Sequence, residues 1–276
     1  FDPKTPSIAT QLRGLLGEEI TITGPDRDLH SGMYGGAAIN PIRVLSAIIA
    51  SLHDEKGRIT VPEFYKGVPQ MDPALKAQWD VLGFDEKDFL GKVGLSELAG
   101  ENGKTALEML WARPTCEVNG IEGGYTGEGA KTVIASKAYA KISMRLVPNQ
   151  DCHEITSLFK SHFESIAPEG VTVKVTPHHG GQGYVTPIDN IGYKAASMAY
   201  KDTFGKSPIP QRGGGSIPIV ALFEKELNSK TILMGFGLDS DAIHSPNEHF
   251  GLFNYFKGIE TIPLFYKYFT ELQSKI

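Results

Sequence analysis

Residues Thr132–Leu146 read TVIASKAYAKISMRL, the longest alternation of apolar and polar side chains in the chain. One face would carry Ala138, Ala140, Ile142, Met144 and Leu146, and the other Tyr139, Lys141, Ser143 and Arg145. Because successive side chains of a β-strand point to opposite faces, this pattern predicts one long strand with one buried face.

The elements on either side of this strand predict the rest of the sheet. Alternating runs at Gly17–Thr23 and Val171–Val175 predict two more strands, and Cys116–Val118 a short fourth. Helices are predicted after Asn40, which is followed by proline, and after Asp151, since both residue types cap helices well. The resulting order, β-α-β-β-α-β, is typical of a ferredoxin-like layer: one antiparallel sheet with two helices on one face.

The remaining segments have a different character. Residues 54–113 are rich in glycine and proline and predict a partly helical insertion. Beyond residue 181 we expect a helix at 190–203, a short apolar strand at 231–235 and a long amphipathic helix at 252–272. These elements resemble the edge of an α/β domain whose strands lack neighbours. We therefore expect that an N-terminal half is missing.

Composition excludes several classes of protein. The 276 residues carry a net charge of −5 and are 41% hydrophobic, so the chain can bury a core but presents no basic field for nucleic acid. Its apolar runs are far too short for a membrane span. The two cysteines, Cys116 and Cys152, lack the spacing of a metal-binding pair and are expected to be free thiols. The chain begins at Phe1 and reads as a piece of a longer protein.

Two histidines lie in loops suited to chemistry. His30 follows Asp28 and precedes several glycines, on a connection that exposes an imidazole. His244 lies among carboxylates in Asp239–Glu248, after a glycine-rich strand exit, which suits a divalent metal ligand. Spacing alone favours an acidic surface loop with an incidental histidine for that second segment, because no second histidine lies at ligand spacing on the same element.

Three further segments are candidates for binding a ligand. Arg212–Pro218, RGGGSIP, predicts either a glycine turn that binds an anion at a helix N-terminus or a plain N-cap at Ser216. Arg145 could hold a carboxylate with two hydrogen bonds, although a single arginine on a solvated strand face is common. His178 and His179 lie at the junction between the two regions, where clefts often form.

Five of these motifs together resemble the M20-family metallopeptidases. They are DLHSGMYGG at 28–36, GAKTVIASK at 129–137, RLVPNQ at 145–150, RGGGSIP at 212–218 and DSDAIHSPNE at 239–248. The chain is most similar to the cytosolic nonspecific dipeptidases and carnosine-dipeptidase-like enzymes, and looks like their C-terminal part.

This resemblance implies a division into domains. Residues 17–181 would form a lid that also mediates homodimerisation, and residues 1–16 with 182–276 would be the C-terminal portion of an α/β catalytic domain. The implied function is metal-dependent hydrolysis of dipeptides or short peptides in the cytoplasm. Two divalent ions, zinc or manganese, would serve as cofactors.

The resemblance also implies roles for single residues. His244 would ligate a metal, and Arg145, His179 and Ser216 would bind substrate. His30 and Thr132 would reach the partner subunit's active site, His30 as the catalytic group near the scissile carbonyl oxygen.

The chain departs from the family pattern in two ways. Gly213 stands where relatives often have glutamate. The family's general base and most of its metal ligands belong to an N-terminal half that these residues do not contain, so we expect the chain alone to be inactive. The alternative is a non-catalytic dimerisation or binding module, or a degenerate family member.

Overall fold

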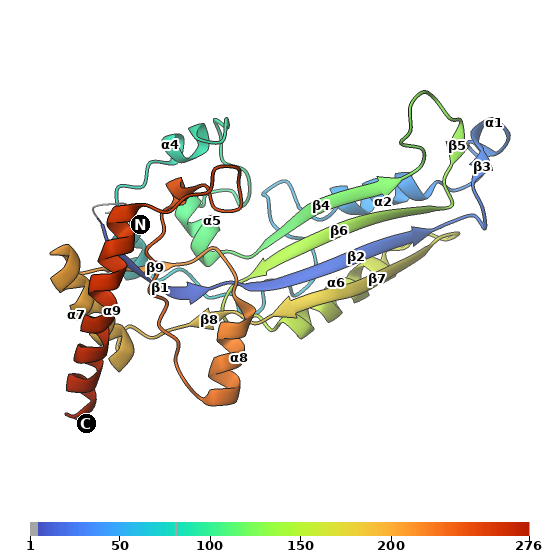
Figure 1. Cartoon of the computed structure of the whole chain (residues 1–276). Helices are drawn as coiled ribbons and strands as arrows, with labels where there is room; N and C mark the ends of the chain where they lie inside the picture. Colours follow the sequence, from blue (N-terminus) through green and yellow to red (C-terminus); the bar gives the residue numbers. More distant parts are fainter. Residues whose placement is uncertain (1–4, 81, 276) are drawn as a thin grey trace. The chain divides into compact units, whose positions relative to one another are not determined.

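The computed structural model describes residues 5–80 and 82–275. The chain divides into two compact units (Figure 1). The central unit is Arg13–Gly183, and the flanking unit combines the segment through Leu12 with Tyr184 and the residues after it. None of the helices in the described ranges has both the length and the hydrophobicity that crossing a membrane requires.

The central unit is built on a four-stranded antiparallel sheet. The strands are β2 (Gly14–Thr23), β4 (Thr115–Gly123), β6 (Lys137–Leu146) and β7 (Thr172–Gly181), in the spatial order β4-β6-β2-β7. Helices α2 (Pro41–Ala50) and α6 (Cys152–Ser165) pack on one face of this sheet (Figure 1). Along the chain the order is therefore β2-α2-β4-β6-α6-β7, the succession of elements that the sequence predicts.

The alternation on β6 builds the core as expected. Its five apolar side chains are all at most 2% exposed and join a core cluster with the inward faces of α2 and α6: Ala138, Ala140, Ile142, Met144 and Leu146. The polar residues between them face away from the helices. Burial of the apolar face against both helices is the main stabilising contribution to this unit.

The prediction of one long strand from Thr132 is wrong for its first third, because the structure has two separate strands here. Residues Val133–Ile134 form β5, which pairs with β3 (Leu29–His30) as a separate two-stranded ribbon. Between β5 and β6, the Ser136 N–H donates a 2.8 Å hydrogen bond to Asp28 Oδ1. The chain therefore leaves the sheet to meet the loop that carries His30 (Figure 1).

Both predicted helix starts are confirmed. The side chain of Asn40 accepts a 2.9 Å hydrogen bond from the Ile42 N–H, and Pro41 occupies the first turn of α2. Asp151 caps α6 through hydrogen bonds from the backbone N–H groups of Glu154 and His153, which hold the pKa of its carboxyl below the usual value.

The insertion is partly helical, as predicted. It contains α3 (Pro73–Asp80), α4 (Glu86–Gly91) and α5 (Ala106–Ala112). The rings of Trp79 and Trp111 meet edge to face with centroids 5.1 Å apart. Arg113 donates two hydrogen bonds to the carboxylate of the buried Glu101, at 2.8 and 3.0 Å.

The two cysteines of the central unit are free thiols, as predicted. Cys116 on β4 is 1% exposed, and Cys152 at the start of α6 is 3% exposed. Burial raises the pKa of the Cys116 thiol to about 12 and also raises the pKa of Cys152. Both side chains act as small apolar groups of the core.

The flanking unit contains a three-stranded mixed sheet. Strand β1 (Ser7–Leu12) pairs antiparallel with β8 (Tyr184–Val185) and parallel with β9 (Ile209–Arg212). The helical elements are α7 (Ile191–Phe204), α8 (Pro218–Leu227), the short 3-10 turn η1 (Asp239–Asp241) and α9 (Leu252–Gln273). The strand predicted at 231–235 is reduced to one isolated bridge, between Leu233 and Ala9.

Glu18 generates a prediction about stability and pH. It is 1% exposed on the helix-facing side of β2, where Oε1 accepts a 2.7 Å hydrogen bond from Thr156 and Oε2 has no partner among the described residues. Burial raises the pKa of this carboxyl above its value in the unfolded chain. Between these two pKa values the folded state binds more protons than the unfolded state. The free energy of unfolding therefore falls as pH rises through this range.

We expect Glu18→Gln to remove this fall. The stabilising effect of the substitution should grow as pH rises above the unfolded pKa of a glutamate, about 4.3, and then level off once Glu18 is ionised in both states. Urea unfolding at several pH values measures it. Thr156→Val, which removes a hydrogen bond that lowers the pKa, should extend the fall to higher pH. A parallel pH dependence of wild type and Glu18→Gln would contradict the prediction.

Candidate functional site

His30 and Thr132 lie side by side at one end of the central unit. His30 pairs with Val133 in the β3–β5 ribbon, and the Ser31 N–H donates a 3.0 Å hydrogen bond to the Thr132 carbonyl. The ribbon lies past the end of β2, next to the short helix α1 (Ser31–Tyr34) (Figure 1). The structure therefore brings together the two residues that the family resemblance links to the partner subunit.

The hydrogen bonding of His30 determines which ring nitrogen it presents. His30 is exposed, and its Nδ1 accepts a 3.0 Å hydrogen bond from the Gly32 N–H as the cap of α1. Since Nδ1 is an acceptor, the neutral ring carries its proton on Nε2. The outward nitrogen is thus a hydrogen-bond donor, as stabilisation of an oxyanion requires.

Arg145 and His179 lie at the other end of the same sheet. Arg145 pairs with Leu15 of β2, and His179 pairs with Gly17 on the opposite edge of that strand. Leu15 and Gly17 are two residues apart, so Arg145 and His179 project from the same face, away from α2 and α6. This face provides a cation and an imidazole on either side of one strand.

The electrostatics around Arg145 favour an anion. Arg13 is 8% exposed, and its pKa is lowered to about 10, first by burial and then by the positive charge of Arg145, with Glu117 acting in the opposite direction. Arg145 forms no ion pair with any described residue. An anion bound at Arg145 would reduce the repulsion between these two guanidinium groups.

The two groups are separated by the length of the sheet. From Gly17, opposite His179, to Thr23 at the end of β2 the strand extends about 20 Å, and the ribbon with His30 begins beyond that point. One imidazole cannot reach across this distance. His30 and His179 of one central unit therefore cannot contact the same small ligand.

Ser216 follows the glycine turn between β9 and α8 in the flanking unit. It is half-buried, but the cap of α8 is Ile217, without a side-chain hydrogen bond, so a plain N-cap at Ser216 is wrong. The Gly213 N–H donates a 2.9 Å hydrogen bond to the Gln11 carbonyl, and a Cβ on Gly213 would lie 2.8 Å from that oxygen. A glutamate at this position would require the turn to move away from β1.

His244 lies in a loop with unusual backbone geometry. Ala242, His244 and Asn247 all have positive φ values, between 54° and 64°, which is rare for residues other than glycine. The side chain of His244 is exposed, and its backbone N–H donates a 3.4 Å hydrogen bond to the Glu248 carboxylate. In the described ranges no three His, Cys, Asp or Glu side chains are arranged to hold a metal ion. His244 can therefore supply one ligand to a metal ion, and the other ligands must come from other residues.

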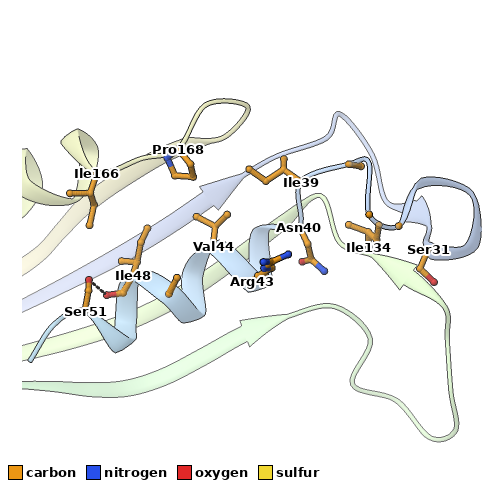
Figure 2. A pocket seen from close by; sticks show the side chains of 14 residues that line it. Ser31, Ile39, Asn40, Arg43, Val44, Ile48, Ser51, Ile134, Ile166 and Pro168 are labelled. Atoms are coloured by element: carbon orange, nitrogen blue, oxygen red, sulfur yellow. Dashed lines mark hydrogen bonds between the residues drawn. The ribbon is translucent and has the colours of Figure 1, made fainter.

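A surface pocket of about 710 Å³ opens along α2, and sequence reasoning missed it. Figure 2 shows Val44 and Ile48 of α2 facing Ile166 and Pro168, with Asn40, Arg43 and Ser31 toward the His30 end. The width of the apolar stripe on α2 could have predicted this pocket. Exposed Ala47 and half-buried Val44 extend the stripe beyond the side chains that enter the core.

Comparison with known proteins gives the family. Residues 10–171 match the family model of the M20 peptidase dimerisation domain. The chain is 34% identical over 275 residues to the Cys-Gly metallodipeptidase dug1 of Schizosaccharomyces pombe, covering 98% of this chain and 57% of that protein.

Two solved structures are similar over nearly the whole chain. The dipeptidase Dug1p of Saccharomyces cerevisiae has a TM-score of 0.83 and 31% identity, with 97% of this chain and 57% of that chain covered. Human carnosine dipeptidase 1 has a TM-score of 0.79 and 28% identity, with coverages of 98% and 57%. The chain thus spans a little over half the length of these relatives. The family match over more than half of its residues shows that the chain belongs to the M20 peptidase family.

Proposed function

We propose that this chain belongs to a dimeric exopeptidase that uses two divalent metal ions to hydrolyse dipeptides or short peptides. The names of its relatives support this, since both the fission yeast relative and the human structure are dipeptidases. Zinc or manganese, and a cytoplasmic location, follow from the resemblance to cytosolic dipeptidases. The metal would activate water for attack on the peptide bond.

The proposal assigns residues 17–181 to a ferredoxin-like lid and residues 1–16 with 182–276 to part of the catalytic domain. The strand order β4-β6-β2-β7 with both helices on one face supports the lid assignment. The boundaries of the central unit, four residues earlier and two later, are compatible with it.

Within this proposal each candidate residue has one role. Arg145, His179 and Ser216 bind the substrate, with Arg145 on its carboxylate. His244 ligates one metal. The Nε2–H of His30 stabilises the oxyanion in the partner's site, with Thr132 beside it.

The observation that carries the proposal is the separation of His30 from Arg145 and His179 along β2. If all of them act on one small substrate, His30 must come from a second copy. A symmetric dimer satisfies this requirement for both sites at once.

The pocket along α2 is the surface that we propose for this second copy. Its lining residues lie between Ser31 and Pro168, within the matched dimerisation domain. It is continuous with the loop after His30, since Gly35, Gly36 and Ala38 also line it. Exposed apolar side chains such as Ala47 and Ile166 would be covered by the partner.

Activity is the first test. The complete protein, supplied with Zn²⁺ or Mn²⁺, should hydrolyse members of a broad dipeptide panel, and chelation should abolish turnover. Residues 1–276 alone, with the same metals, should be inactive. An inactive complete protein in a folded, metal-loaded state would favour the non-catalytic module, and turnover by residues 1–276 would refute the predicted incompleteness.

Mixing variants tests the role of His30 across the dimer. His30→Ala should lower kcat about 10²–10³-fold, as loss of one oxyanion donor does. After subunit exchange with His244→Ala, activity should recover to about a quarter of wild type, because half of the dimers are hybrids with one intact site. A His30 that acts within its own subunit predicts no recovery. Unmixed samples of each variant serve as controls.

Ala47→Glu tests the proposed interface. A carboxylate introduced into an apolar contact opposes burial, so sedimentation should show a shift from dimer to monomer, accompanied by loss of kcat. Ser46→Glu is the matched control, because Ser46 is exposed on the same helix but does not line the pocket. If both variants remain dimeric, the interface lies elsewhere on the unit.

A further inference from the structure

The pairing of β2 with β7 contains a β-bulge beside His179. Glu18 pairs with Pro177, whereas Gly17, the preceding residue of β2, pairs with His179. His178 is therefore the extra residue of β7, and its Nε2 lies 3.6 Å from a carboxylate oxygen of Glu19. Bulges redirect the side chains that follow them. Here the bulge places His179, rather than His178, opposite Gly17.

The imidazole of His179 lies against the backbone of Gly17. A Cβ atom on Gly17 would lie 2.9 Å from Cε1, 3.3 Å from Nδ1 and 3.4 Å from Nε2 of this ring. These ring atoms are its three nearest neighbours. Gly17 is buried although it projects from the open face, whereas His179 is itself exposed. The ring thus occupies the space of the missing side chain, as an aromatic group covers a strand glycine.

We propose that Gly17 is a positioning residue, and that its missing side chain sets where the imidazole of His179 meets the substrate. The inference rests on the proposed function, in which His179 binds substrate. Any larger residue at position 17 displaces the ring from β2. Substrate held on one side by Arg145 then loses its contact on the other side of the strand.

The surroundings of Gly17 indicate that its role is to position His179 and not to allow the strands to pair. The φ angle of Gly17 lies outside the left-handed region, so alanine fits its backbone. The atoms that a Cβ would meet belong to an exposed side chain that can rotate into solvent. At Gly14, by contrast, a Cβ would lie 2.9 Å from the Gly181 carbonyl oxygen, and the strands themselves would have to move.

The test compares Gly17→Ala and His179→Ala, singly and together, in the complete metal-loaded protein. Gly17→Ala should leave the urea midpoint close to wild type. Its crystal structure should show the ring of His179 swung away, and isotope-labelled histidine NMR should show the His179 signal shifted. On dipeptide substrate, kcat/KM should fall by up to about 10²-fold, the cost of a small misplacement. In the His179→Ala background, Gly17→Ala should cause no further loss.

Gly120→Ala is the matched control, since Gly120 lies on β4 of the same sheet with open space where a Cβ would be. It should leave activity and the His179 signal unchanged. A ring that keeps its position in Gly17→Ala, or an equal loss of kcat/KM with and without His179, overturns the positioning role. If no dipeptide is hydrolysed by wild type, the proposed function fails, and the crystal structure and NMR signal alone decide whether Gly17 sets the ring.

Discussion

Strand β2 is the constraint on which the rest of the central unit depends, because it is paired along both edges. All ten of its residues pair with β6, and nine of them pair with β7. Its inward side chains, among them Leu16, Ile20 and Ile22, lie in the core. A slip of one residue would turn these side chains toward the open face and carry Gly17 and Glu18 to the wrong sides. The same register that buries the core therefore sets the position of the candidate site.

Departures from ordinary packing gather at the beginning of this strand. Arg13 is buried close to a second guanidinium, Glu18 is buried with one oxygen unpaired among the described residues, and the bulge at His178 interrupts the ladder between them. Burying a charge near a like charge and burying an unpaired carboxylate oxygen both cost stability. Such local conflicts are expected where a protein binds ligands. Their concentration at one end of β2 agrees with the binding role that we propose for Arg145 and His179.

Periodicity predicted the architecture from sequence, and its failures have physical causes. The alternation on β6 identified every buried residue of that strand, and the caps Asn40 and Asp151 marked both core helices. Alternation could not reveal that residues 133–134 leave the sheet, because the hydrogen bond from Ser136 joins a residue more than a hundred positions away. The bulge at His178 was equally hidden, since it depends on pairing between strands. Motifs supplied the candidate residues, but their separation along the sheet emerged only from the register.

The two buried thiols have a consequence for how the fold can be observed in solution. Only the thiolate reacts with alkylating reagents, and burial keeps both Cys116 and Cys152 protonated and covered. Cys116 lies on an outer strand of the sheet and Cys152 at the first turn of α6. Labelling at either position therefore requires the sheet or the helix to open first. The rate at which each native thiol is alkylated therefore reports how often its part of the core opens. Together the two rates compare local opening at the edge of the sheet and at the start of α6, without an introduced cysteine.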